Sequence, residues 1–181
     1  MVKVTLGTKG EPVRFSYANV HQAVSVNGSD PKYSVSIIIP KSHKETIKKV
    51  NEAIQKAKQE NKDKFGGKLP SSMKTPLRDG DVDREDDEAY ADSYFINANS
   101  KIKPGIVDAD LNPIMDQSEF YSGCYGRVSL TFYAYNVNGN KGIAAGLQNI
   151  MKTTDGDPLG GRSSAEADFA DDSEDDDDIL G

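Results

Sequence analysis

The chain has 181 residues, enough for a single domain with a buried core, and its formal net charge at pH 7 is −7. Its single cysteine, Cys124, excludes an internal disulfide and a zinc site built from cysteines. No apolar run approaches the length of a membrane span, and residues 1–10 lack the pattern of a signal peptide. We therefore expect a protein that works inside a cell.

The net charge hides an uneven distribution of acids and bases. Residues 166–178 contain nine acids and no base, so residues 1–165 hold all 22 bases against 20 acids and carry +2. A second acidic block, 79–92, has eight acids and one base, and without it the remaining body carries +9. This asymmetry is more informative about partners than the mean charge is.

Three strands are predicted within the first forty residues. Residues 2–6 alternate between apolar and polar side chains and are bounded by glycines. The next strand, 13–20, also alternates, and Tyr17 falls on its apolar side. The third strand, 33–39, is the most apolar of the three, and we expect Tyr33, Val35, Ile37 and Ile39 to point inward.

A lysine-rich helix is predicted to follow Pro40. Ser42 is a suitable N-cap, and Glu45 three residues later completes a capping box. Apolar residues then recur at helical spacing from Ile47 to Ala57. We interpret the lysines between them as a solvated face rather than as a DNA contact.

Residues 68–90 are predicted to be irregular, because prolines and glycines interrupt every regular pattern. The acids that begin at Asp79 do not match a calcium loop. Such a loop needs Gly at its sixth position and Glu at its twelfth, where this chain has Arg84 and Tyr90. A metal-dependent nuclease stays open as an alternative function, although no motif supports it. Its carboxylates would be Asp79, Asp81, Asp108 and Asp110.

Residues 127–150 are predicted to form a β-hairpin that turns at Asn138 and Gly139, a pair typical of tight turns with positive φ. Alternation buries one face of the first strand, from Val128 to Ala134. The opposite face has a cation, two hydroxyls and two tyrosines, which can bind phosphates and stack bases. These residues are Arg127, Ser129, Thr131, Tyr133 and Tyr135. Exposed tyrosines are also common on ordinary sheets, so the residues alone leave both interpretations open.

Shorter elements complete the body. Residues 94–102 and 106–107 are predicted strands, and residues 152–164 are predicted to be loop. No phosphate-binding loop of the GxxxxGK[ST] type occurs, which argues against an ATP-driven role. We expect Cys124 to be a small buried hydrophobic residue.

Residues 166–181 have the composition of a disordered tail. The acidic run is followed by two apolar residues, and such a string fits a basic partner groove that ends in a hydrophobic pocket. The predicted partner-binding residues are Asp175, Asp176, Asp177, Asp178, Ile179 and Leu180. A protein-interaction adaptor that binds through its acidic segments is therefore a second alternative function.

Six segments between about residues 10 and 170 are the most distinctive. They are SYANV, YSVSIIIPK, PLRDGD, PGIVDAD, YSGCYGRVSLTFYAYNVNGNKGIAAGLQNIMK and DGDPLGGRSSAEADF. Together they resemble the single-stranded-DNA-binding proteins of tailed bacteriophages. The resemblance implies a mainly β protein with one or two helices, in which a five-stranded Greek-key barrel, the OB fold, carries insertions and a disordered acidic tail.

The resemblance also implies a function. It is sequence-independent binding of single-stranded DNA in phage replication and recombination, in the cytoplasm of the infected bacterium, without enzymatic activity, cofactor or metal. The tail, 166–181, would recruit replication or recombination proteins and compete with DNA for the domain 1–165. A homo-oligomer is a further expectation.

We expect the DNA-binding groove to cross the hairpin face. Phosphates would be neutralised by Arg14, Lys101, Lys103, Arg127 and Lys141. Bases would stack on Tyr133 and Tyr135, with Tyr17 and Tyr125 as further candidates.

Overall fold

A computed structural model of the chain describes residues 1–159. Five of its strands close into a ring, and each strand pairs with two others of the five. They are β2 (Val13–Val24), β3 (Lys32–Pro40), β5 (Ser93–Ser100), β7 (Tyr125–Val137) and β8 (Asn140–Thr154). The pairings are antiparallel except between β5 and β8. Around the ring the order is β2, β3, β5, β8 and β7, so the fifth strand of the barrel lies between the third and the fourth. This is the order of the Greek-key barrel of an OB fold, which the sequence predicted.

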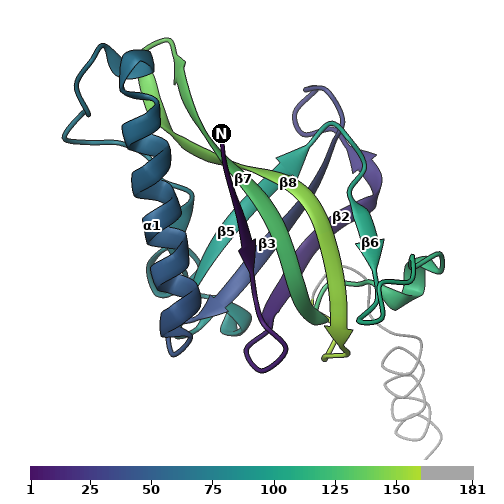
Figure 1. The fold of residues 1–181 in the computed structure, drawn as a ribbon. Helices are drawn as coiled ribbons and strands as arrows, with labels where there is room; N and C mark the ends of the chain where they lie inside the picture. The colour runs from purple at the N-terminus through teal and green to yellow at the C-terminus, as the bar shows by residue number, and fades with distance from the viewer. Residues whose placement is uncertain (160–181) are drawn as a thin grey trace, which may run out of the picture.

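Two short strands extend this barrel. β1 (Val2–Leu6) pairs with β7, and β6 (Gly105–Val107) runs parallel to β8 (Figure 1). A short 3-10 helix, η3 (Gln117–Glu119), precedes β7.

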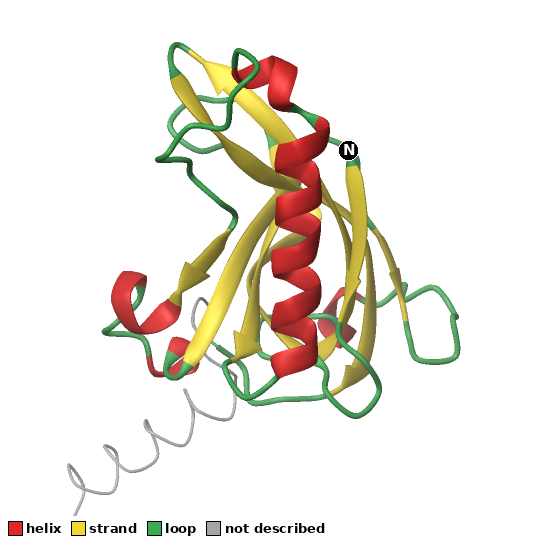
Figure 2. Cartoon of the chain, turned by 60° about the vertical axis from the view of Figure 1, so that its left-hand side comes forward, coloured by secondary structure: helices red, strands yellow, loops and turns green. Residues whose placement is uncertain are grey.

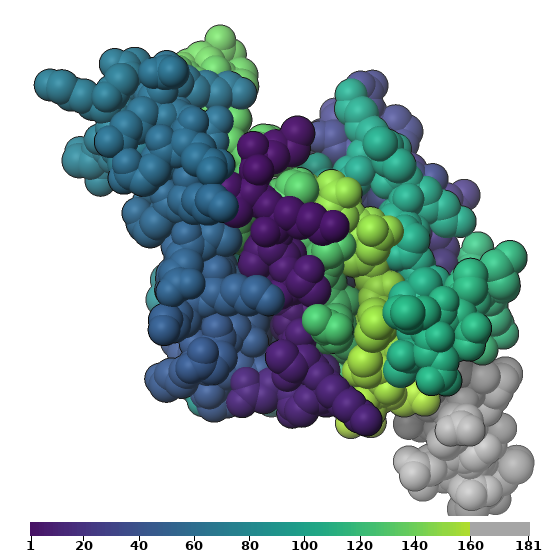
Figure 3. Space-filling view, in the orientation of Figure 1, coloured from purple at the N-terminus to yellow at the C-terminus, as the bar shows by residue number. Residues whose placement is uncertain are grey.

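Most of the helical structure lies in one long connection between β3 and β5. It contains α1 (Lys44–Glu60), η1 (Lys62–Phe65), β4 (Leu77–Asp79), α2 (Gly80–Asp83) and η2 (Glu88–Tyr90). The helix α1 runs along one side of the barrel beside β1, while α2 and η2 lie apart from it at the opposite end of the connection (Figures 1 and 2). The space-filling view shows the atoms of α1 packed against those of β1 (Figure 3). No helix in residues 1–159 is both long and apolar enough to cross a membrane.

The core fills the barrel with the residues that the alternation predicts. Val128, Leu130, Phe132 and Ala134 of β7 are all buried, and so are Ile143, Ala145, Leu147 and Ile150 of the facing strand. Burial of each large apolar side chain contributes about 1.5–3 kcal/mol. The helix α1 adds a buried stripe that includes Val50, Ile54 and Ala57, which confirms its predicted inner face.

The hairpin turn is also confirmed. Asn138 and Gly139 have φ values of 52° and 82°, the positive angles that a tight two-residue turn requires. The strand β8 is longer than predicted, because its ladder with β7 continues to Thr154 opposite Tyr125. The prediction that the loop starts at residue 152 is therefore wrong. The last residues of β8 are polar, so the sequence has no alternation of apolar and polar residues there that would predict a strand.

Two local predictions near the N-terminus are also wrong. The N-cap of α1 is His43 rather than Ser42, because a turn from Pro40 to His43 delays the helix by one residue, and no side chain caps it. Tyr17 is not on the apolar side of β2: its φ is +47° and the pairing with β3 shifts register just beyond Ser16. The bulge turns Tyr17 outward, where 56% of the residue is exposed, and leaves Ser16 buried.

Candidate nucleic-acid interface

A row of small residues, four polar side chains and one glycine, follows the outer surface of the barrel across all five strands. Its members are successive ladder partners on neighbouring strands. They are Asn19 of β2, Ser34 of β3, Asn99 of β5, Gly146 of β8 and Thr131 of β7. Asn97 lies two residues before Asn99 on the same face of β5, opposite the buried Ser36. We call Asn19, Ser34, Asn97, Asn99, Gly146 and Thr131 the polar lane; none of them is long enough to keep a ligand away from the sheet.

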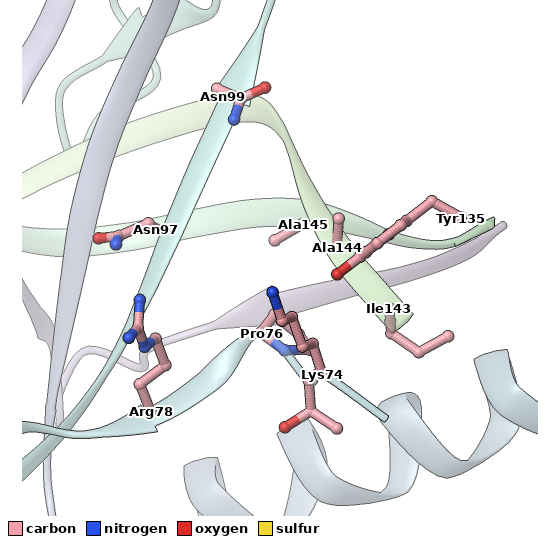
Figure 4. Close-up of a pocket in the computed structure, with 10 residues that line it drawn as sticks. Lys74, Pro76, Arg78, Asn97, Asn99, Tyr135, Ile143, Ala144 and Ala145 are labelled. Carbon is pink, nitrogen blue, oxygen red and sulfur yellow. The ribbon is translucent and has the colours of Figure 1, made fainter. Parts of the chain in front are cut away.

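The lane deepens into a hollow of about 420 Å³ beside the hairpin. Its floor includes Asn97, Asn99 and Ala144, and Figure 4 shows Tyr135 and Arg78 projecting toward the space from opposite sides. Lys74 lines the same hollow. A bound strand would therefore meet amide groups below it, an aromatic ring at one side and cations at the other.

The cationic border comes from the connection between β3 and β5. The Ile143 N–H donates to the Lys74 carbonyl at 2.9 Å, which fixes this segment to the start of β8. Arg78 follows on β4 opposite Phe95, and its Nε donates to Asp83 at 3.1 Å. The terminal nitrogens of Arg78 point toward Asn97 in Figure 4, where they are placed to meet a phosphate.

Two tyrosines border the lane at the hairpin. A Cβ atom on Gly142 would lie 2.6 Å from the Tyr135 hydroxyl, and one on Gly146 would lie 3.7 Å from the Tyr133 ring. These glycines of β8 give the rings room to lie against the sheet. Tyr135 thus offers a ring face at the hollow and Tyr133 offers one beside Gly146 of the lane, which is the geometry that base stacking needs.

Tyr17 stands at the other end of the lane, beside the acidic block 79–92. This block was predicted to be irregular, yet it is folded onto the barrel. Tyr90 is fully buried there, and its hydroxyl donates to the Ser36 Oγ at 2.9 Å. Its ring packs edge-on against Phe95, with the centroids 5.0 Å apart. Burial raises the pKa of the Tyr90 hydroxyl, which keeps it a neutral donor.

Lys41 fixes the base of this block. Its ammonium lies 2.9 Å from Asp79 and 2.7 Å from Asp81, and the Asp92 N–H donates to Asp81 as well. These two donors lower the pKa of the Asp81 carboxyl, Lys41 more than the backbone. The carboxylate is therefore charged at neutral pH, and the stability that it adds is lost only as the pH falls through its lowered pKa.

The nine predicted site residues fall into three groups: four at the lane, two on the loop after β5 and three elsewhere on the barrel. Tyr17, Tyr133 and Tyr135 border the lane, and Lys141 lies where the hairpin meets Lys74, whose N–H donates to its carbonyl at 3.3 Å. Lys101 and Lys103 are exposed on the loop after β5, where Lys101 forms a loose pair with Asp30 at 3.5 Å.

The structure does not bring the other three predicted residues to the lane. The Arg14 guanidinium donates to the carbonyls of Gly123 and Asp157 and lies 5.2 Å from the Tyr125 ring centroid, so this pair fastens residues 155–159 to the barrel. Arg127 donates to the Gly7 carbonyl at 2.9 Å, beside β1.

Sequence reasoning missed five residues of this surface. They are Lys74, Arg78, Arg84, Asn97 and Asn99. The two asparagines had a signal, because they alternate within a predicted strand in the same way as the hairpin tyrosines do. The cations had none, since their place depends on where an irregular segment docks.

The carboxylates that a nuclease would use have other contacts. Asp79 and Asp81 bind Lys41, while Asp108 accepts the N–H groups of Asp110 and Asn112 in its own loop. Within residues 1–159 no three His, Cys, Asp or Glu side chains are grouped closely enough to hold a metal ion. Burial raises the pKa of the Cys124 thiol, which makes it a poor nucleophile.

The ring order and the lane on its outer face together define an OB-fold protein whose surface suits an extended polymer. The chain belongs to the Enterobacter phage Enc34 ssDNA-binding protein family, whose model matches residues 2–180. The family predicted from the sequence is thereby confirmed.

Individual relatives agree with this assignment. Protein p50 of Acyrthosiphon pisum secondary endosymbiont phage 1 is 31% identical over 171 residues, which cover 88% of the chain and 90% of p50. The structure of the bacteriophage Enc34 single-stranded DNA-binding protein in complex with ssDNA has a TM-score of 0.73 and 24% identity, with 87% of this chain and 89% of that one covered. Gp2.5, a single-stranded DNA-binding protein of bacteriophage T7, has a TM-score of 0.54 and 15% identity, covering 88% of this chain and 98% of its own. These two structures share the fold.

Proposed function

We propose that the chain binds single-stranded DNA without sequence preference through the polar lane, and that it is not an enzyme. The observation that carries this proposal is the lane itself: polar side chains of four strands and Gly146 of the fifth run between Tyr17 and the hairpin tyrosines, with cations on one border. Membership of an ssDNA-binding protein family supports it independently.

The position of the lane fits the way in which OB folds bind. Oligonucleotides bind to these folds across the second and third strands and against the loops that join the first to the second and the fourth to the fifth. In this chain those strands are β3 and β5, and the second of those loops is the tip of the hairpin. The surface found from side chains is thus the surface that the fold favours.

Binding combines two physical effects. Each base stacked on a tyrosine contributes roughly 1–3 kcal/mol, and because every base has a π-face the preference among sequences is weak. Each phosphate neutralised by a cation releases counterions, so affinity falls as salt rises. A titration of fluorescent oligo-dT, matched duplex and RNA at two salt concentrations tests the proposal. Failure to retain oligo-dT in dilute salt would favour the adaptor, and Mg²⁺-dependent cleavage would favour the nuclease.

Replacing Lys74 and Arg78 with glutamine is expected to flatten the salt dependence. Two lost phosphate contacts reduce the slope of log K against log salt by about 1 to 1.4 for a single strand. The measurement is oligo-dT affinity at four or more salt concentrations. Lys49→Gln with Lys56→Gln is the matched control, because these exposed lysines lie on α1, outside the lane. An equal change of slope in both variants would contradict the assigned border.

The tail residues Asp175 to Leu180 lie outside the described residues, so their role stays a proposal from the sequence. We propose that they recruit replication or recombination proteins and compete with DNA for the lane. Leu159, the last described residue, lines a hollow beside Tyr17, so the described part of the chain ends near the lane. A short tether gives its acids a high effective concentration there.

Deleting residues 166–181 is therefore expected to tighten binding of oligo-dT, with the largest gain at low salt, where charge repulsion is least screened. Affinities of the full-length and shortened chains, measured across a salt series, check this. Equal affinities in dilute salt would argue against competition.

The cellular setting follows from the family. We propose that the protein protects single strands during phage DNA replication and recombination in the cytoplasm of the infected bacterium. Its relatives are phage proteins, which supports that setting. We also propose that copies of the chain self-associate, which sedimentation of the free protein and of its complex with oligo-dT tests.

A further inference from the structure

The acidic block 79–92 is a fixed part of the surface at the Tyr17 end of the lane. Tyr90 anchors it by burial and by its bond to Ser36, and Lys41 clamps its other end through Asp79 and Asp81. Figure 2 shows the two short helices of this block set against the barrel end that lies away from the hairpin tip. The charges that the block carries are therefore held in place beside the lane.

Arg84 is the single base of the block, and it lies among aromatic rings. Its guanidinium carbon is 5.5 Å from the centroid of Tyr17, 5.8 Å from Tyr90 and 5.6 Å from Phe95. A planar cation at these distances is attracted to ring faces and restrains them. Arg84 thus links the exposed ring of Tyr17 to the buried anchor of the block.

The backbone at Tyr17 is strained, and the strain presents the ring to solvent. A φ of +47° is unusual for a residue with a large side chain, because the Cβ atom is crowded by the backbone there. The ring gains little core packing in return, because Tyr17 is 56% exposed. Strain without burial indicates a position used for binding.

Acidic side chains surround this ring. Glu85, Asp86, Asp87 and Glu88 line one hollow together with Tyr17. A phosphate in this hollow would be repelled, whereas a neutral base stacked on the ring would not be. The cations Lys74 and Arg78 lie in the other hollow, so base and backbone are attracted to different parts of the surface.

We propose that the 79–92 block makes the interface selective for unpaired strands. Arg84 holds Tyr17 ready to stack one unpaired base, and Glu85, Asp86 and Glu88 repel the second phosphate backbone of a duplex. A single strand keeps its only backbone on the cationic border, but a duplex has phosphates on both edges and its bases are already stacked. The inference rests on the proposed function, since it assigns the specificity of the same interface.

The test is neutralisation of the block without loss of its fold. The variant is Glu85→Gln with Asp86→Asn and Glu88→Gln; Asp87 is kept, because its carboxylate accepts the Ala89 N–H at 3.1 Å. In about 50 mM salt we expect duplex affinity to rise about tenfold and oligo-dT affinity less than about threefold, with both gains shrinking as salt rises.

A matched control carries the same change of net charge at exposed positions outside the block. It is Glu11→Gln with Asp110→Asn and Glu119→Gln. The ratio of oligo-dT affinity to duplex affinity should be the same in this control as in the unmodified chain. If both triple variants gain duplex affinity equally, the effect belongs to net charge and the proposal is overturned.

Substitutions at Arg84 separate its positioning role from a phosphate contact. Arg84→Lys keeps the charge but loses the planar group, so both it and Arg84→Ala should weaken oligo-dT binding several-fold and reduce tyrosine quenching, with the salt slope unchanged. Full affinity in Arg84→Lys, with a slope reduced by about 0.7 in Arg84→Ala, would make Arg84 a phosphate ligand instead.

The same titrations distinguish the two levels of proposal. An unmodified chain that ignores oligo-dT overturns the proposed function itself. One that binds oligo-dT and duplex equally well leaves that function standing and overturns only the selectivity of the block.

Discussion

Changing Tyr133 and Tyr135 together to alanine is expected to weaken oligo-dT binding at least about thirtyfold. Each base–aromatic stack is worth roughly 1–3 kcal/mol by alanine substitution; Tyr135 lines the hollow, and the Tyr133 ring lies against Gly146 of the lane. The loss should persist at high salt, because stacking involves no counterion release. Fluorescence anisotropy of labelled oligo-dT at low and high salt measures both properties.

The matched control replaces the same two residues with phenylalanine. It keeps the ring faces and removes only the hydroxyls, so affinity should stay within about threefold of the unmodified chain. Tyr133 is 36% exposed, and its loss should barely change the melting temperature. Unchanged affinity in the alanine variant would contradict the role of the hairpin end, and so would a large loss in the phenylalanine variant.

The hairpin illustrates what the sequence makes predictable. Strict alternation from Val128 to Ala134 needs only the two-residue period of a strand, and Asn138 with Gly139 needs only local turn geometry. Both were predicted correctly, because neither depends on distant parts of the chain. The same alternation gave the outward direction of Arg127, Tyr133 and Tyr135.

Outward direction alone does not say which part of a barrel surface a residue joins. The strand β7 is 13 residues long and belongs to a closed ring, so its outer face turns through several directions. Tyr135 therefore reaches the lane, while Arg127 meets Gly7 beside β1. The prediction that Tyr135 and Arg127 line one groove followed from the two-residue alternation of the strand. It did not take account of how the strand curves around the barrel.

Tyr17 and Lys74 show two further limits. A bulge with positive φ leaves no periodic signal, so the alternation placed Tyr17 inside although its ring is exposed. Lys74 reaches the lane only because its carbonyl accepts a hydrogen bond from Ile143, which lies 69 positions along the chain. A contact of that kind follows from the docking of a whole segment rather than from a local pattern.

Changing Tyr90 to alanine is expected to detach the acidic block. Loss of a fully buried aromatic side chain costs about 3–5 kcal/mol, and much of that cost falls on the segment that the ring anchors. Amide exchange in residues 79–92 should accelerate by orders of magnitude, while the strands of the barrel keep their protection. Hydrogen exchange and denaturant unfolding measure the local and the global effects.

Tyr90→Phe is the control, because it keeps the packing against Phe95 and removes only the bond to Ser36. Its cost should be about 1–3 kcal/mol, the penalty for leaving the buried Ser36 hydroxyl without that partner. If the block determines selectivity, Tyr90→Ala should also bind duplex more tightly relative to oligo-dT, as the neutralised block does, and Tyr90→Phe should not. If amide exchange in residues 79–92 is unchanged in Tyr90→Ala, the block does not depend on this anchor. If exchange is faster but the preference for oligo-dT over duplex is unchanged, the block does not determine the specificity of the interface.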